Sequence, residues 1–454
     1  MTTTTLTPDT AAIRSVAAGA LKFITCGSVD DGKSTLIGRL LVDSKTVLVD
    51  QLAGVQRGGE TDLALLTDGL SAEREQGITI DVAYRYFATA QRKFIIGDAP
   101  GHEQYTRNMV TAASSADAAV VLVDATKLPW ATQLEGGDAA THALLPQTRR
   151  HSLLAHLLRV PSIVFAINKL DAVEDPAHPG AAATAYQRIR AAVEVFAKAA
   201  GIEVAAIVPI SALKGWNVVD RAADHIGHKN PHWCGYEGQS LLQILEQLPC
   251  ATEPENQAFA FPVQWVEKFS SSSDTSQGRR VFWGRVAAGS VTPGQLVTVF
   301  PSGKSASVAQ VLDHARTPKD IHAGHSAGVV LDREVDVSRG DWLLATGSYP
   351  ATRELQVTVA WMDDEPLVAG RVYWALHGHR WVKARVKRIV HRLDVNTLAE
   401  EDATQLEANS IGHVELSLQG DLATLPYSES RILGAMVLVD TASNKTAGAV
   451  LVRD

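Results

Sequence analysis

The segment at residues 27–34 constrains the fold of this chain more than any other part of the sequence. It reads Gly-Ser-Val-Asp-Asp-Gly-Lys-Ser and fits the phosphate-loop pattern GxxxxGK[ST]. An apolar run at residues 21–26 precedes it, and an amphipathic segment at residues 34–42 follows it. A phosphate loop needs a strand before it and a helix after it, because its backbone N–H groups must converge on phosphate at a helix N-terminus. The sequence therefore predicts an α/β domain around this loop.

The loop residues are the first candidates for nucleotide contacts. Lys33 would reach the β- and γ-phosphates, and the Ser34 hydroxyl would bind Mg²⁺. The alternative is a chance match in a glycine turn, but only about a few hundredths of a match is expected in a chain of this length. We therefore predict that the nucleotide contacts residues Gly27, Ser28, Val29, Asp30, Asp31, Gly32, Lys33 and Ser34.

A second motif indicates which base the nucleotide carries. Asn168-Lys169-Leu170-Asp171 follows an apolar run at residues 163–167. The Asp171 carboxylate can accept two hydrogen bonds from the N1–H and exocyclic amine of guanine, whereas adenine would leave this charge buried and unpaired. Most four-residue matches of this kind are solvated loops, but a strand end downstream of a phosphate loop favours a base site. The base pocket would be completed by Ser211, Ala212 and Leu213, which follow the run at residues 205–210.

A third motif lies between the other two and predicts contacts to the γ-phosphate and the metal. Asp98-Ala99-Pro100-Gly101-His102 follows a short apolar run. An aspartate at a strand end can hold Mg²⁺ through water, and the Gly101 N–H can bind the γ-phosphate. Thr79 is a further candidate ligand, and the alternative is that it is an ordinary strand residue. The predicted Mg²⁺ ligands are Ser34, Thr79 and Asp98.

The pattern of apolar, β-branched and turn-forming residues along the chain predicts its domains. Residues 1–20 are rich in Thr and Ala and read as a flexible leader. Across residues 21–250, apolar runs alternate with helical patterns, which predicts a parallel-type sheet with helices on both faces. Later, short β-branched stretches are separated by Gly, Pro and Asp, which is typical of all-β barrels. We expect one barrel over residues 256–350 and a second over residues 351–454.

Composition excludes several classes of protein. With 46% hydrophobic and 20% charged residues, the chain is of the ordinary globular type. No apolar run approaches the ~18 residues of a membrane span, and the N-terminus does not read as a secretory signal. Three scattered cysteines predict neither disulfides nor a zinc site, so we expect a reducing cytoplasm. The net charge of −8 argues against nucleic acid as the main partner.

Five motifs occur in the order typical of one class of GTPases. GSVDDGKST, GITID, DAPGH, NKLD and SAL together resemble the translation-factor class, which includes elongation factor Tu. The longer stretches LALLTDGLSAEREQGITIDVAYRYF, GHEQYTRNMVTAAS, INKLDAV and GVVLDREVDVSRGDWL are similar to one branch of it. That branch is the GTPase (large) subunit, subunit 1, of bacterial sulfate adenylyltransferase. RLDVNTL and NSIGHVEL extend the resemblance over most of the chain.

The resemblance implies a function as well as a fold. The chain would bind GTP and Mg²⁺, with His102 orienting the attacking water. GTP hydrolysis would be coupled to the synthesis of adenylyl sulfate and pyrophosphate from ATP and sulfate, in a heterodimer with a small catalytic subunit that binds ATP and sulfate. The coupling has a physical basis, because the phosphoric–sulfuric anhydride is a high-energy product. The alternative is a translation elongation factor that delivers aminoacyl-tRNA.

The sequence departs from the family pattern in places. Ala99 stands where the class usually has Thr, but its role through the backbone should survive. Residues 128–145 form a longer segment than is usual before Gln147–His151 and read as a surface insertion. The sequence ends at Asp454 with one phosphate loop, so we expect no adenylyl-sulfate kinase activity, which some family members carry.

Three other patterns have simpler explanations than the functions they suggest. His225-Ile226-Gly227-His228 spells the HxGH signature of adenylyl-transferring enzymes, but it sits in a polar loop and we expect a chance match. The histidines of this loop with Cys234 match no standard zinc spacing. Alternating basic residues at 383, 385 and 387, beside tryptophans, suggest an RNA surface. They are more typical of a solvated sheet face, or of a surface for an acidic protein partner.

Overall fold

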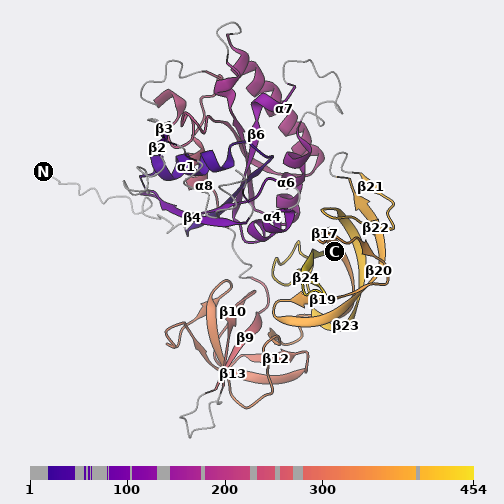
Figure 1. The fold of residues 1–454 in the computed structure, drawn as a ribbon. Helices are drawn as coiled ribbons and strands as arrows, with labels where there is room; N and C mark the ends of the chain where they lie inside the picture. Colours follow the sequence, from indigo (N-terminus) through magenta and orange to yellow (C-terminus); the bar gives the residue numbers. More distant parts are fainter. Residues whose placement is uncertain are drawn as a thin grey trace, which may run out of the picture. The chain divides into compact units, whose positions relative to one another are not determined.

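The chain folds into two compact units, Met1–Ala251 and Thr252–Asp454 (Figure 1). The computed structural model describes residues 19–45, 56–57, 60–61, 63, 79, 81–102, 105–129, 144–174, 179–224, 233–250, 256–268, 280–394 and 399–454. In the described residues, the first unit combines a sheet with helices, and the second is built of strands. No helix in the described part of the chain is long and apolar enough to cross a membrane.

The first unit is built on a six-stranded sheet of order β4-β5-β1-β6-β7-β8. Its neighbouring strands are parallel except for β4, which pairs antiparallel with β5 at one edge. Every residue of β6 and β7 is buried, as expected for parallel strands that are covered on both faces. The strands are β1 (Leu21–Gly27), β4 (Ala83–Ala88), β5 (Lys93–Asp98), β6 (Ala118–Asp124), β7 (Ser162–Asn168) and β8 (Val204–Pro209), with a small separate pair of β2 (Gln56–Arg57) and β3 (Glu60–Thr61).

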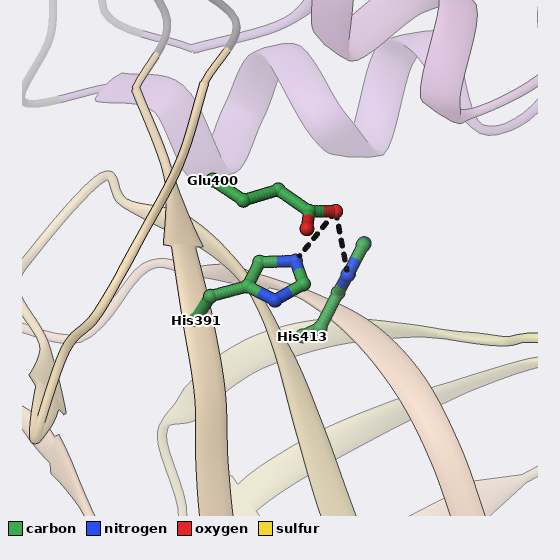
Figure 2. Close-up of side chains that lie close together, drawn as sticks. All are labelled: His391, Glu400 and His413. Carbon is green, nitrogen blue, oxygen red and sulfur yellow. Dashed lines mark ion pairs between the residues drawn. The ribbon is translucent and has the colours of Figure 1, made fainter.

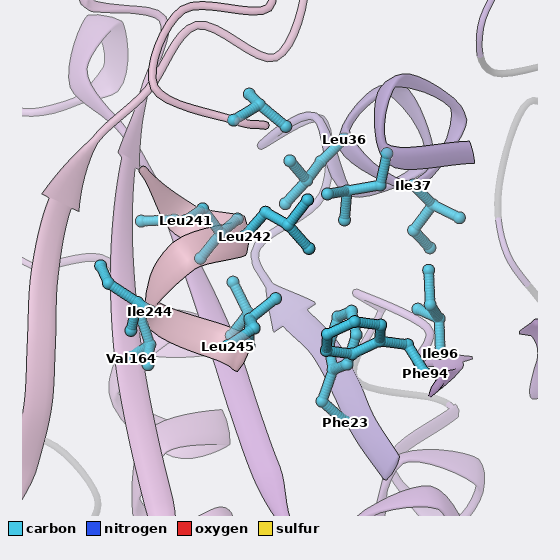
Figure 3. Packing of buried hydrophobic residues seen from close by; sticks show 14 of the residues in the cluster. Phe23, Leu36, Ile37, Phe94, Ile96, Val164, Leu241, Leu242, Ile244 and Leu245 are labelled. Carbon is cyan, nitrogen blue, oxygen red and sulfur yellow. The ribbon is translucent and has the colours of Figure 1, made fainter. Parts of the chain in front are cut away.

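Two helices cover one face of this sheet with a shared apolar core. Leu36 and Ile37 of α1 (Lys33–Asp43) pack in the same cluster as Leu241 and Leu245 of α8 (Leu241–Gln247), above Phe23 and other strand residues (Figure 3). A capping box begins α8, since the Ser240 hydroxyl accepts the Gln243 N–H and the Gln243 side chain accepts the Ser240 N–H. The other helices are α4 (Thr106–Ala113), α6 (Pro146–Leu157) and α7 (Ala181–Ala199), with single turns η4 (Ala125–Lys127), η5 (Leu170–Ala172) and η6 (Ala222–Asp224).

The second unit begins with a closed antiparallel barrel. Its strand order is β10-β15-β13-β12-β16-β9, and its interior is filled by residues such as Phe261, Phe282 and Val299. Closure leaves no free sheet edge for another chain to pair with. The strands are β9 (Ala260–Lys268), β10 (Arg280–Arg285), β12 (Leu296–Phe300), β13 (Lys304–Leu312), β15 (Ser326–Leu331) and β16 (Trp342–Ala345), with an outlying pair β11 (Ser290–Val291) and β14 (Ile321–His322).

A second barrel follows in the same unit. The strands run in the order β19-β24-β25-β17-β23-β20, and a β19–β20 pairing closes the ring. The predicted fold class, an α/β domain followed by two barrels, is therefore confirmed. The strands are β17 (Ala351–Trp361), β19 (Val372–His377), β20 (Arg380–Leu393), β23 (Ile411–Ala423), β24 (Ala435–Asp440) and β25 (Thr446–Val452); β21 (Glu400–Glu401) extends β20, and β18 (Leu367–Val368) pairs with β22 (Gln405–Leu406).

A buried cluster joins the two barrels. Trp342 of the first barrel is fully buried and stacks on His377 of the second, with ring centroids 5.1 Å apart. His377 Nε2 lies 3.0 Å from the Leu433 carbonyl oxygen, and burial lowers the pKa of this histidine to about 4. Gly378 follows in the β19–β20 hairpin with φ +58°, and a Cβ there would lie 2.8 Å from Trp342. A side chain at position 378 would therefore press on Trp342 of the first barrel.

We expect Gly378→Ala to destabilise the second unit more than Gly347→Ala does. Both glycines have positive φ, but a Cβ at Gly347 would meet nothing within 4 Å. The left-handed backbone should cost about 1–2 kcal/mol at either site, and the clash with Trp342 should add about 1–3 kcal/mol at Gly378. Urea denaturation of the full chain, followed by tryptophan fluorescence, measures the difference. Equal losses in the two variants would contradict the steric argument.

Candidate functional site

The phosphate loop connects β1 to α1 at the carboxyl ends of the parallel strands. Two of its glycines cannot be replaced without strain, because Gly27 and Gly32 have φ of +144° and +93°. A Cβ at Gly27 would lie 2.7 Å from the Leu122 carbonyl oxygen, and one at Gly32 would lie 2.5 Å from the Asn168 side-chain nitrogen. The loop is thus held closely against the ends of β6 and β7.

Lys33 is buried at the centre of the loop. Its ammonium group donates to the carbonyl oxygens of Ser28 at 2.7 Å and Gly27 at 3.4 Å. Burial lowers the pKa of Lys33, and the charges of Asp31 and Asp98 oppose this shift. A Cβ at Gly101 would lie 2.5 Å from the Lys33 nitrogen, so the third motif packs directly on the lysine of the first. The structure therefore brings together two motifs that are separated by about 70 residues in the sequence.

Asp31 lies inside the phosphate loop with its carboxylate buried. One carboxylate oxygen accepts the Ser28 N–H at 2.7 Å, and the other lies 3.1 Å from the Lys127 ammonium group. Burial raises the pKa of Asp31, and the charges of Lys127 and Lys33 partly offset this rise. The carboxylate thus binds a backbone donor of the loop, while lysines on both sides balance its charge.

Asn168 joins the phosphate loop to the predicted base pocket. Its side-chain nitrogen donates to the Asp31 carbonyl oxygen at 2.8 Å, and its side-chain oxygen accepts the Ala212 N–H at 3.0 Å. The neighbouring Lys169 has φ +64° and donates to the Asp30 carbonyl oxygen at 2.6 Å. The same ammonium group lies 2.7 Å from Asp124 at the end of β6. Asn168 and Lys169 therefore connect the end of β7 to the phosphate loop, to the loop after β8 and to the end of β6.

The remaining predicted base-pocket residues lie around this junction. Leu170, Ser211 and Ala212 are buried, Asp171 is half-buried in η5, and Leu213 is exposed. Arg39 of α1 donates to the Ala212 carbonyl oxygen at 3.2 Å, which holds the loop after β8 against α1. Asp171 therefore lies beside this junction and is half-buried.

The third motif begins at the buried carboxyl end of β5. Asp98 is paired with Thr25 of β1 and accepts a hydrogen bond from its hydroxyl at 3.3 Å. The Ala99 N–H donates to the Thr25 carbonyl oxygen at 3.2 Å, so the motif is held through its backbone. Pro100 is buried, Ser34 and Thr79 are half-buried, and residues 64–78 and residue 80 lie outside the described part of the chain.

His102 ends the third motif with an unsatisfied ring nitrogen. Its Nε2 atom is buried and has no hydrogen-bond partner among the described residues. The ring lies edge-on to Tyr105, with centroids 6.4 Å apart. A buried polar atom without a partner costs free energy. A water molecule bound at this atom would remove that cost, which fits the predicted role of His102.

His151 is a site residue that the sequence motifs did not identify. It lies on α6, is fully buried, and its Nδ1 atom accepts the N–H of Gly27, the first loop residue, at 3.1 Å. Thr148, one turn earlier, has its hydroxyl 3.2 Å from that of Ser28. Burial, followed by the charges of Lys33 and Arg150, lowers the pKa of His151 to about 3, so the ring stays neutral and can accept. The only sequence signal was the segment Gln147–His151, which marked a family resemblance.

The structure gives less information on the HxGH tetrapeptide, the long segment before α6, the cysteine pattern and the basic stretch. Residues 225–232, with the HxGH tetrapeptide and the other histidine of that loop, and residues 130–143 of the long segment lie outside the described residues. Cys234 is buried and free. In the basic stretch of β20, Lys387 and Arg388 form ion pairs with Glu354 and Glu415, at 2.9 Å and 2.7 Å. This pairing favours a solvated sheet face over an RNA surface.

Comparison with known proteins gives consistent matches along the chain. The family of the elongation factor Tu GTP binding domain matches residues 19–250, and the GTP-eEF1A C-terminal domain-like family matches residues 354–453. Sulfate adenylyltransferase subunit 1 of Laribacter hongkongensis is 42% identical over 444 residues, which cover 95% of this chain and 85% of that protein. The subunit 1 of Citrobacter koseri is 42% identical, with 96% of this chain and 86% of that protein covered. The bifunctional enzyme CysN/CysC of Xylella fastidiosa is 45% identical, and the match spans 94% of this chain and 65% of that protein.

We expect Asp171→Asn to change the base preference from guanine to xanthine. An amide at this position can donate to the 2-oxo group that replaces the exocyclic amine, whereas it cannot accept both guanine donors. Binding titrations with GTP and XTP measure the change. Retention of the normal preference for GTP would show that Asp171 does not face the base.

We expect His151→Ala to weaken GTP binding by about tenfold, because it leaves the Gly27 N–H without its acceptor and loosens the loop. His156→Ala is the matched control, since His156 lies on the same helix and is only partly buried. Titration with a fluorescent guanine nucleotide gives both affinities. Wild-type affinity in the His151 variant would contradict a role in holding the loop.

Proposed function

The chain belongs to the family of sulfate adenylyltransferase subunit 1, and from this membership we propose the reaction that it serves. It is a GTPase subunit that couples GTP hydrolysis to the formation of adenylyl sulfate and pyrophosphate from ATP and sulfate, in sulfate assimilation. The observation that carries the proposal is the extent of the likeness, 42% identity over 95% of the chain. A guanine nucleotide is the ligand that a GTP binding domain of this family takes.

The translation-factor alternative has the same motifs and the same two barrels. It predicts a free basic surface for aminoacyl-tRNA. The ion pairs of Lys387 and Arg388 with glutamates work against such a surface. Two relatives that match over 95% and 96% of the chain carry the sulfate adenylyltransferase name, which favours the main proposal.

Phosphate binding would begin with a change of partners at Lys33. Its ammonium group donates to two carbonyl oxygens of its own loop. Phosphate oxygens carry full negative charge and are stronger acceptors than neutral carbonyl groups. A bound triphosphate would therefore draw Lys33 off its own loop and raise its lowered pKa towards the ordinary value. The backbone N–H groups at the start of α1 would share the rest of the phosphate charge.

Hydrolysis would use His102 to orient the attacking water. The buried Nε2 atom of His102 is a hydrogen-bonding group with no partner in the described residues, and it follows directly on Gly101, which packs against Lys33. A ring held in this place can fix a water molecule near the γ-phosphate. Such positioning lowers the barrier because the nucleophile no longer has to be ordered in the transition state.

Mg²⁺ would be held by oxygen donors around the loop. Ser34, Thr79 and Asp98 offer two hydroxyl groups and a carboxylate, which is the donor set that this hard cation prefers. Asp98 is buried beside the phosphate loop, where its charge acts on Lys33. Bound there with GTP, the ion would neutralise charge on the β- and γ-phosphates.

The ATP and sulfate sites would lie on a second polypeptide, a small catalytic subunit. A protein named subunit 1 has a partner subunit, and this chain carries a single phosphate loop, which GTP would occupy. Loss of the γ-phosphate should move the segments around Thr79 and Asp98, which gives the partner two states to distinguish. The free cysteines Cys26, Cys234 and Cys250 support a reducing compartment, and we propose the cytoplasm.

Reconstitution with the small subunit tests this division of work. We expect GTP turnover to rise when ATP and sulfate are present. Lys33→Ala should abolish hydrolysis by removing the charge at the phosphates, and His102→Ala should slow it about 100-fold while GTP still binds. Phosphate and pyrophosphate release measure the two reactions.

The chain alone is the control, and we expect it to release no pyrophosphate from ATP and sulfate. Robust release that survives Lys33→Ala but is lost in His225→Ala would overturn the proposal and assign the reaction to the HxGH tetrapeptide. Normal GTP turnover in His102→Ala would remove the role proposed for that histidine.

A further inference from the structure

Three potential metal ligands meet on the second barrel, far in sequence from the nucleotide motifs. They are His391 on β20, Glu400 on β21 and His413 on β23, and their side chains point toward one another (Figure 2). Among the described residues, this is the one group of at least three His, Cys, Asp or Glu side chains with such spacing.

The strand register explains why these residues share a face. His391 lies directly opposite His413 in the β20–β23 pairing. Glu400 lies opposite Leu393, which is two residues from His391 and so points to the same side of β20. Val414, the neighbour of His413, belongs to the barrel core, so His413 points to the outer face of the barrel. The cluster is therefore a product of register and not of a local motif.

The distances suit a metal ion of the zinc type. Nε2 of His391 lies 3.0 Å from a carboxylate oxygen of Glu400, and Nδ1 of His413 lies 3.9 Å from the same oxygen. Ligands at ~2.0–2.1 Å from a tetrahedral ion stand about 3.4 Å from each other. The Nε2 atom of His391 is buried and makes no hydrogen bond within the described residues, in spite of its closeness to the carboxylate. A shared ion would replace this close nitrogen–oxygen contact with two metal–ligand bonds.

We propose that His391, Glu400 and His413 bind a divalent transition-metal ion of the Zn²⁺ class. Two imidazole nitrogens and one carboxylate oxygen are typical zinc ligands, and three protein ligands leave a fourth position for water. Mg²⁺ prefers oxygen ligands throughout, so it would not compete well here. The site shares no residue with the predicted GTP-binding site.

Arg453 competes with the metal ion for this site. Its guanidinium group lies 2.7 Å from Nδ1 of His413, the atom that would bind the metal. Guanidinium can only donate, so it uses the same lone pair that a metal ion needs. Metal binding therefore requires Arg453, the second-last residue of the chain, to leave His413.

Zinc binding to the full-length chain tests the proposal. The protein is stripped with a chelator, kept free of nucleotide, and titrated with Zn²⁺ in competition with a chromophoric chelator. We expect one equivalent to bind, Glu400→Gln to weaken it by about tenfold or more, and His391→Ala/His413→Ala to remove it. His322→Ala/His325→Ala is the matched control, because this histidine pair has ring centroids 6.3 Å apart and belongs to no three-ligand group.

Arg453→Ala provides a readout that a merely structural cluster would not give. Its removal should tighten Zn²⁺ binding by about tenfold, because a hydrogen bond to a charged group no longer has to be broken. Absence of a stoichiometric equivalent in the wild-type chain, or an equivalent that survives in His391→Ala/His413→Ala, would overturn the proposal. GTP binding measured on the same samples, expected to equal wild type, shows that the variants are folded.

Discussion

The two hydrogen bonds of the Asn168 side chain hold the nucleotide site together. One amide group donates to the phosphate loop and accepts from the loop after β8. These loops come from strands that are not adjacent in the sheet, and the amide lies at the end of β7 between them. Because an amide is both donor and acceptor, it can bridge a carbonyl group and an N–H group at once. A carboxylate or an ammonium group in its place could satisfy only one of them.

Buried charged side chains surround the Asn168 amide, and each would be destabilising without a partner of opposite charge. Asp31 and Asp124 are buried, and Lys127 and Lys169 lie within ion-pair distance of them. Removal of one partner of such a pair leaves a buried charge without compensation. This lowers the stability of the fold far more than the loss of an exposed pair does. Lys33 balances its own charge with loop carbonyl groups. The network therefore keeps the loop in shape while leaving Lys33 with partners that phosphate can replace.

The β unit uses a different principle, since its stability depends on shape more than on charge. Both barrels are closed, and the cluster around Trp342 and His377 joins them into one unit. The second barrel carries ion pairs along β20 and the His391, Glu400 and His413 cluster near the end of that strand. A closed barrel holds such surface groups in fixed positions, because its strand register cannot slip without moving core residues outward.

Local chemistry in the sequence was sufficient to predict the nucleotide loops, the α/β domain and the two barrels. The phosphate loop, the DxxGH segment and the NKxD segment each indicate a strand followed by a turn. Each also contains the residue types that phosphate or guanine binding requires. The edge strand β4 was not among the predicted sheet strands, because its residues do not form a continuous apolar run. His151, the Asn168 bridge, the Trp342 contact and the cluster of His391, Glu400 and His413 came only from the tertiary structure. Each of these contacts joins residues that are distant along the chain. Strand register and helix packing decide which of those residues meet, and no short motif contains that information.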